Sequence, residues 1–135
     1  MATFEWTAAY AVGVAKFDQQ HQTLFRTVQE MHEALGQGHG KDVVGKILQR
    51  LIDYTANHFA AEEAAMEKNH YPALLAHKAE HKALVTQVLQ FQKEFVTGAP
   101  GIAAMLMPFL QKWLHNHIMQ TDKQYGPYLN EKGVH

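Results

Sequence analysis

The stretch YPALLAHKAEHKALVTQVLQFQKEF, residues 71–95, decides the fold that this sequence predicts. Its apolar residues recur at steps of three and four, the pattern of an amphipathic helix with one face in a protein core. His77 and His81 lie on that same apolar face, one helical turn apart. Because burying an imidazole without a partner costs free energy, two histidines on a buried face need an explanation beyond packing.

The composition limits the classes of protein that the sequence can encode. The chain has 135 residues, 47% hydrophobic and 19% charged, which predicts a single globular domain over residues 1–135. A net charge of −1 offers no electrostatic surface for nucleic acid or an anionic membrane. The absence of cysteine excludes disulfides, thiolate metal sites and cysteine nucleophiles. The unusual feature is ten histidines, nearly as many as all lysines and arginines together.

The N-terminal sequence shows no basic region followed by an uninterrupted apolar core, so it does not read as a signal peptide. No segment approaches the roughly 20 apolar residues that cross a bilayer. We therefore expect a cytoplasmic protein with no membrane partner.

Four amphipathic segments, separated by the breaks GQGHGK, NHYP and TGAPG, predict the architecture. We expect helices over about residues 18–36, 41–67, 72–97 and 101–125. Asp18 is a candidate N-cap for the first helix, and Gly126–Pro127 is the expected end of the last. Helices of this length with short connections favour an all-α, antiparallel up-down-up-down four-helix bundle with an N-terminal arm and a short C-terminal tail.

Polar side chains on the inner faces fall at one level of this bundle. In an antiparallel bundle, the starts of the odd helices and the ends of the even helices share one end. Six inner-face residues lie in those segments: His21, His58, Glu62, His77, His81 and His117. Independent core histidines would have no reason to agree in depth, so the agreement predicts a shared site.

The spacings within these segments suit metal ligation. Residues i and i+4 are about 6 Å apart along a helix and differ by about 40° around it, so HxxxH and HxxxE each direct two ligands at one ion. Imidazoles with a carboxylate suit iron, zinc or copper, and ligands from four helices are too many for one tetrahedral zinc. Two ions bridged by carboxylates would use them, with Asp122 as the best second carboxylate. Because a five-residue step from His117 is about 140° off its face, helical spacing alone leaves Asp122 undecided.

Over nearly its whole length the chain resembles the single-domain bacterial hemerythrins, or bacteriohemerythrins. The matching pieces are EWTAAYAVGVAKFDQQH, HFAAEEAAM, HYPALLAHKAEH and WLHNHIMQTDKQY, and the ordered pattern H…HxxxE…HxxxH…HxxxxD is highly specific. The resemblance implies a non-haem di-iron centre that binds O2 reversibly. It implies two iron ions, each Fe2+ or Fe3+, that share a bridging oxo or hydroxo group, and O2 as the bound ligand.

The resemblance also implies roles for individual residues. One iron would be held by three histidines, which are His77, His81 and His117. The other iron, which keeps an open position, would be held by His21 and His58. The carboxylates of Glu62 and Asp122 would bridge the two ions. The residues implied around the O2 pocket are Leu24, Phe59, Trp113, Leu114 and Ile118.

Three other interpretations stay open at this point. A sensor would pass a change at the metal site to a partner, but the chain offers no output domain. A di-iron oxidase, peroxidase or nitric oxide-handling enzyme would need a substrate route and a second open metal position. A structural zinc bundle fits the ligand set poorly. We expect oxygen storage, delivery or scavenging rather than catalysis, with dioxygen as the partner and any oxygen-consuming partner enzyme unidentified.

A few polar residues near these segments are expected to lie outside the site. His32 is on the inner face of the first helix but about 16 Å along the axis from His21. Glu63 and Glu80 point about 100° away from the ligands beside them, so we expect them to be surface charges.

Overall fold

The computed structural model describes residues 5–38, 41–98 and 101–135. Its elements are the short 3-10 helix η1 (Ala8–Tyr10), α1 (Ala15–Gly36), α2 (Lys41–Lys68), α3 (Leu74–Val96), α4 (Ile102–Asn116), the π-helical segment η2 (His117–Asp122) and α5 (Lys123–Glu131). These three ranges contain no strand, and no helix within them is long and apolar enough to cross a membrane. Residues 1–4 of the expected arm, and residues 39–40 and 99–100 of the expected breaks, lie outside the described residues.

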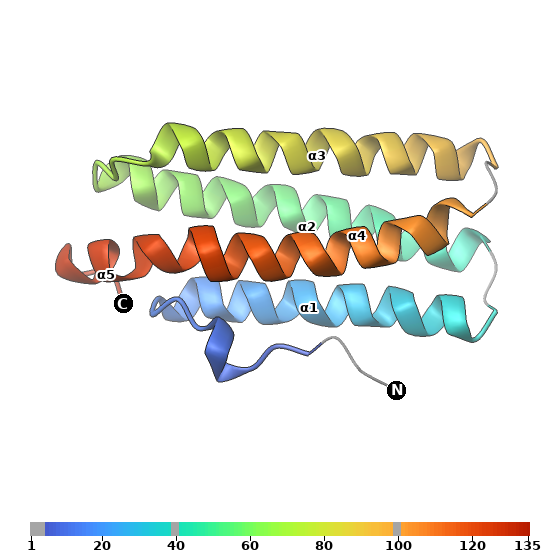
Figure 1. Ribbon diagram of the computed structural model, residues 1–135, viewed down its shortest axis with the longest axis horizontal. Coiled ribbons are helices and arrows are strands. Elements are labelled where there is room, and N and C mark those ends of the chain that lie inside the picture. The colour runs from blue at the N-terminus through green and yellow to red at the C-terminus, as the bar shows by residue number, and fades with distance from the viewer. Residues whose placement is uncertain (1–4, 39–40, 99–100) are drawn as a thin grey trace.

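Successive long helices run in opposite directions and lie side by side (Figure 1). The fourth of them is composite, because α4, η2 and α5 follow one another without a break. The predicted all-α, antiparallel four-helix bundle is confirmed. Its helix ends lie within two residues of the expected ones, except at the start of α1 and the end of α5.

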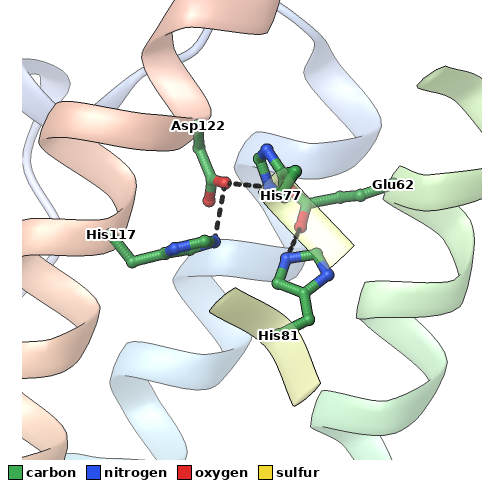
Figure 2. A group of neighbouring side chains, drawn as sticks. All are labelled: Glu62, His77, His81, His117 and Asp122. Carbon is green, nitrogen blue, oxygen red and sulfur yellow. Dashed lines mark ion pairs between the residues drawn. The ribbon is translucent and has the colours of Figure 1, made fainter. Parts of the chain in front are cut away.

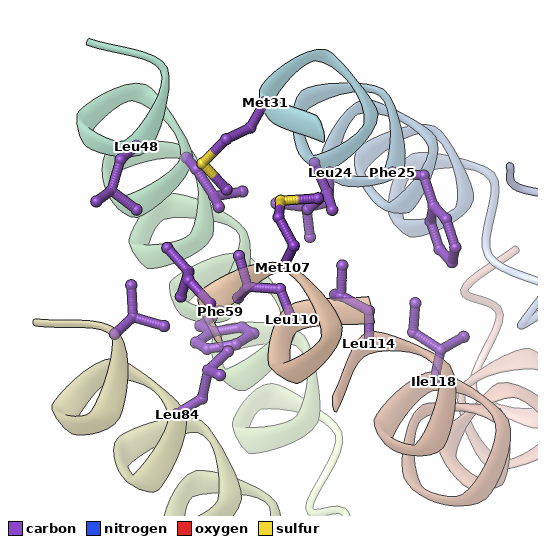
Figure 3. Close-up of a cluster of buried hydrophobic side chains, with 14 of the residues drawn as sticks. Leu24, Phe25, Met31, Leu48, Phe59, Leu84, Met107, Leu110, Leu114 and Ile118 are labelled. Atoms are coloured by element: carbon purple, nitrogen blue, oxygen red, sulfur yellow. The ribbon is translucent and has the colours of Figure 1, made fainter. Parts of the chain in front are cut away.

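The bundle forms because each helix turns an apolar stripe to its centre. Leu24 and Met31 of α1 and Leu48 of α2 are each 1% exposed, and side chains from α3 and α4 close the other side of the cluster (Figure 3). Burying one such side chain contributes roughly 1.5–3 kcal/mol to the free energy of unfolding. This apolar cluster is therefore a major source of the stability of the bundle.

The N-terminal arm is fixed against the end of the composite fourth helix. Lys123 donates a hydrogen bond from Nζ to the carbonyl of Ala9 at 2.9 Å. Asn130 donates from Nδ2 to the carbonyl of Gly13 at 3.0 Å. Val12, between those two contacts, is 5% exposed. The arm therefore covers one end of the bundle as part of its core.

The expectation that Asp18 caps the first helix is wrong. The helix begins at Ala15 after the N-cap Val14, and Asp18 lies within the first turn. Its carboxylate accepts a hydrogen bond from the main-chain N–H of Val12 at 2.8 Å. Tertiary burial of the arm starts the helix earlier than the capping signal indicates, and the acidic side chain still suits the positive end of the helix dipole.

The last helix also continues beyond its expected end, since Gly126 and Pro127 lie inside α5. Tyr125 and Leu129, on either side of this pair, are both 0% exposed. Their burial holds the segment helical although Gly and Pro disfavour it, because packing supplies most helix stability in proteins.

Gly126→Ala should destabilise the protein, because a Cβ at this position would lie 1.9 Å from the main-chain oxygen of Val12. The arm or α5 must then move, which we expect to cost about 1–3 kcal/mol in the free energy of unfolding. Gly36→Ala is the matched control, since a Cβ there meets nothing within 4 Å. Thermal or urea denaturation of the two variants measures the difference, and equal stabilities would show that the arm is not seated on Gly126.

Candidate metal centre

Seven ligand-type side chains converge at one level of the bundle. They come from α1, α2, α3 and η2, and they are His21, His58, Glu62, His77, His81, His117 and Asp122, none more than 4% exposed. Figure 2 shows five of them, with rings and carboxylates directed at one another. The structure thus brings together all seven residues that the sequence analysis singled out. His32 is half-buried on α1 and belongs to neither ligand group described below.

The carboxylate of Glu62 contacts imidazoles from three helices. Its Oε1 lies 3.2 Å from Nε2 of His58 and 3.3 Å from Nε2 of His81. Its Oε2 lies 3.5 Å from Nε2 of His21 and accepts a hydrogen bond from the hydroxyl of Tyr125. The carboxylate therefore lies between side chains of α1, α2, α3 and α5, with Oε2 held by the hydroxyl of Tyr125.

The carboxylate of Asp122 has an equivalent place on the other side of the site. Its Oδ1 lies 2.9 Å from Nε2 of His77 and 3.0 Å from Nε2 of His117, while its Oδ2 lies 3.1 Å from Nε2 of His21. Asp122, like Glu62, thus lies between histidines of different helices.

The donor atoms form two overlapping groups, in each of which they all lie within 4.8 Å of one another. The larger group contains Glu62, His77, His81, His117 and Asp122, and the smaller contains His21, His58, Glu62 and Asp122. Because the two carboxylates belong to both groups, the arrangement suits two neighbouring ions with two shared ligands. It is also unequal, with five donors on one side and four on the other.

The π-helical segment η2 explains how Asp122 reaches the site. In a regular α-helix a residue five positions after His117 would point elsewhere, whereas the i→i+5 pattern of a π turn brings positions five apart onto one face. Segment η2 runs from His117 to Asp122, so its two ends both face the site. This local change of winding brings Asp122 to the position that helical spacing alone left undecided.

The donor set fits divalent metal ions. The atoms that face the centre are buried yet have no partner with hydrogen-bond geometry: Nε2 of His21, His77, His81 and His117, Oε1 of Glu62 and Oδ1 of Asp122. Buried polar groups are normally satisfied, so six unsatisfied donor atoms aimed at one space indicate a missing partner. Imidazole nitrogens mixed with carboxylate oxygens are ligands for iron, zinc or copper.

Glu63 and Glu80 do lie at the surface, with side chains 26% and 45% exposed, but their carboxylates also contact histidines of the site, which was not expected. Oε2 of Glu63 lies 2.8 Å from Nδ1 of His81, and Oε1 of Glu80 lies 3.0 Å from Nδ1 of His117. A rotation of about 100° from the neighbouring residue of the site directs each side chain toward the next helix of the bundle, where its carboxylate reaches a histidine while part of it stays in solvent. Gln20 and Tyr125 also contact residues of the site, although no sequence pattern marked them. Gln20, like Glu63 and Glu80, directly neighbours a residue of the site in sequence.

An apolar cavity of about 30 Å³ lies beside the site and is lined by Leu24, Phe59 and Leu114 among others. Of the residues implied around the O2 pocket, these three line it and two do not. Ile118 is buried, at 1% exposed, whereas Trp113 stacks on the ring of His117 with a centroid distance of 4.3 Å. Phe59 also stacks on the ring of His81, at 3.6 Å.

The electrostatics of the metal-free site are those of a buried charge cluster. Burial lowers the pKa of His21, but Asp122 and Glu62 raise it more, to about 9. Burial raises the pKa of both carboxylates, yet the surrounding histidines hold both well below their ordinary values. Burial, followed by the charges of Glu62 and Asp122, raises the pKa of Tyr125 well above its ordinary value. In the absence of metal, a proton on His21 thus helps to balance the charge of the two carboxylates.

Comparison with known proteins supports the same assignment. The sequence profile described as "Hemerythrin HHE cation binding domain" matches residues 12–129. The chain is 40% identical over 131 residues to a Bacteriohemerythrin of Methylococcus capsulatus, covering 96% of this chain and 99% of that protein. It is 33% identical over 126 residues to a Bacteriohemerythrin of Stenotrophomonas maltophilia, covering 93% of this chain and 81% of the relative.

A solved structure described as "Crystal structure of hemerythrin:wild-type" has the same fold, with a TM-score of 0.88 at 40% identity. The match covers 95% of this chain and 98% of that one.

The melting temperature of the metal-free protein should fall as the pH rises from about 6.5 to above 9. The raised pKa of His21, from 6.5 to about 9, means that its contribution to stability is complete below 6.5 and lost through 9. The lowered pKa of Glu62 acts in the opposite direction, so its contribution is complete above about 4.5 and lost in acid. Thermal unfolding of metal-free protein from below pH 4.5 to above pH 9 measures both effects.

The same protein loaded with Fe2+ is the control for this measurement. Metal binding requires neutral imidazoles and replaces the protons, so the loss between pH 6.5 and 9 should be smaller in the loaded protein. Equal slopes with and without metal would contradict this account of the site.

Proposed function

We propose that this chain, which belongs to the hemerythrin family, binds dioxygen reversibly at a non-haem di-iron centre and thereby stores, delivers or scavenges oxygen. Hemerythrins are in general dioxygen-binding proteins with non-haem di-iron centres. The single observation that carries the proposal is the unequal division of five histidines around two shared, buried carboxylates.

The proposed ligands follow the two groups of donor atoms. His77, His81 and His117 would hold one iron, His21 and His58 would hold the other, and the two carboxylates Glu62 and Asp122 would bridge them. The group with only four donors is the one with room for a further ligand. When bound, the iron pair supplies the electrons and the open coordination position that dioxygen needs.

The remaining residues keep the site rigid and dry. The hydroxyl of Tyr125 donates to Glu62 and fixes the direction of that carboxylate. Leu24, Phe59 and Leu114 form an apolar wall beside the site. Such a wall disfavours water and protons, which would otherwise compete with dioxygen and promote irreversible oxidation.

Two observations favour a dioxygen carrier over a di-iron oxidase. Five neutral imidazoles with two carboxylates differ from the glutamate-rich sets of ferritin-like di-iron proteins. In addition, the cavity beside the site has a volume of only about 30 Å³, far below that of a typical organic-ligand pocket, which suits a diatomic gas better than an organic substrate.

Reduced, iron-loaded protein mixed with air and then purged with argon tests the proposal. We expect two irons per chain and a visible absorption spectrum that appears with air, disappears on purging and returns over several cycles. One iron per chain, or a single irreversible oxidation, would contradict it. Steady turnover of an added organic substrate or of nitric oxide would support an enzyme instead.

Leu114→Ala should shorten the lifetime of the dioxygen-bound spectrum while leaving iron content unchanged. Leu114 is 5% exposed and lines the cavity three residues before His117. Removing its side chain enlarges a space that borders polar ligands, so water should enter it. Stopped-flow absorbance over minutes to hours measures the decay.

Leu48→Ala is the control for cavity formation. Leu48 is 1% exposed but lies ten residues before His58, which is about 15 Å along α2. Both variants should lose about 2–5 kcal/mol of unfolding free energy, and only Leu114→Ala should change the decay. Equal decay rates in the parent protein, Leu48→Ala and Leu114→Ala would show that Leu114 does not line the dioxygen pocket.

A further inference from the structure

The outer nitrogens of the ligand histidines have partners of different charge. Nδ1 of His81 meets the carboxylate of Glu63, and Nδ1 of His117 meets the carboxylate of Glu80. Nδ1 of His58 instead meets the neutral amide oxygen of Gln20, at 2.5 Å. Within the described parts of the chain, Nδ1 of His21 has no hydrogen-bond partner.

This difference in charge follows the division between the two metal positions. Both outer carboxylates act on histidines of the five-donor group, whereas neither histidine of the four-donor group has an anionic partner at Nδ1 among the described residues. The five-donor position therefore receives two additional negative charges, each one imidazole ring away from the metal. The four-donor position receives none.

The three contacts also connect the helices in order around the bundle. Gln20 of α1 reaches His58 of α2, Glu63 of α2 reaches His81 of α3, and Glu80 of α3 reaches His117 of η2. Each partner directly neighbours a ligand of its own helix, so it is placed by the same turn that places that ligand.

Glu80 is itself fixed by a further contact. The hydroxyl of Thr121, inside the π-helical segment, lies 3.0 Å from Oε1 and 3.2 Å from Oε2 of Glu80. The winding that brings Asp122 into the site thus also presents a donor to the carboxylate behind His117. Glu80 is the more exposed of the two carboxylates, at 45% against 26% for Glu63.

We infer that Glu63 and Glu80 are positioning residues that make the two metal positions unequal, so that the five-donor position holds iron more tightly and favours its ferric state. A carboxylate that accepts a hydrogen bond from Nδ1–H fixes the ring and raises the donor strength of Nε2. Gln20 fixes the ring of His58 without adding charge, so iron at the four-donor position is held less tightly and leaves first. The inference rests on the proposed di-iron function.

Charge-only substitutions test this inference. Glu63→Gln and Glu80→Gln keep an oxygen that accepts from Nδ1–H, as Gln20 already does, and remove only the charge. Gln20→Glu adds the charge on the other side. Glu67→Gln is the matched control, because Glu67 is exposed on α2 one turn after Glu63.

Anaerobic Fe2+ protein equilibrated with a graded series of a ferrous chelator gives the iron retained per chain. The parent should release its two irons in two steps. Glu63→Gln and Glu80→Gln should weaken the more tightly held iron by about 10–100-fold, bringing the steps together. Gln20→Glu should tighten the iron that leaves first, and Glu67→Gln should change neither step.

The reduction potential of the centre is the second readout, because a merely structural role would not move it. The two Glu→Gln variants should raise the potential, since loss of negative charge favours the ferrous state, and Gln20→Glu should lower it. The melting temperature of each metal-free variant reports any general loss of stability. If one variant does not fold, the other three substitutions still decide the outcome.

The failures of the two proposals can be told apart. A parent that binds fewer than two irons would overturn the proposed function. A parent that binds two irons, with release steps and potential unchanged in both Glu→Gln variants and in Gln20→Glu, would overturn this inference alone. Equal weakening of both irons, matched by an equal loss of metal-free stability, would also overturn it and leave the glutamates as structural contacts.

Discussion

The constraint on which the rest of the structure depends is the burial of two carboxylates, Glu62 and Asp122, inside a four-helix bundle. A buried, uncompensated charge costs far more than the few kcal/mol by which a domain of this size is stable. Five imidazoles surround the pair, and a proton on His21, whose pKa the two carboxylates raise, or metal ions at the site would compensate its charge. One half of the bundle is therefore an ordinary apolar core, while the other is stable only when the charge at its centre is balanced.

The bundle meets this constraint by changing its winding at one place. A regular fourth helix would direct either His117 or Asp122 into the site but not both, and the π-helical segment directs both. The same segment places Thr121 against Glu80, behind His117. Burial of Tyr125 and Leu129 keeps the helix continuous beyond this irregular turn, and the N-terminal arm packs against it there. The irregular turn and the arm are thus both part of how the site is held.

The contacts behind the histidines link helix packing to the properties of the centre. Each contact joins adjacent helices, so a displacement of one helix would change the orientation of an imidazole on the next. Because those partners carry charge on one side only, they distinguish the two donor groups, which share both carboxylates. The cavity beside the site is a separate feature, and its mostly apolar lining is unfavourable for water.

The sequence by itself determined the four-helix bundle and the level of the site. Helical periodicity places His21, His58, Glu62, His77, His81 and His117 on inner faces, and antiparallel packing brings them to one depth, as the structure has them. Only the tertiary structure decided three other matters: how Asp122 reaches the site, that Glu63 and Glu80 contact histidines of the site, and that the last helix runs through Gly126–Pro127. The reason is that a regular period of 3.6 residues fixes directions only within one regular helix. The winding of an irregular turn, the position of the neighbouring helix and the burial of flanking side chains are set by the assembled bundle, and no local pattern encodes them.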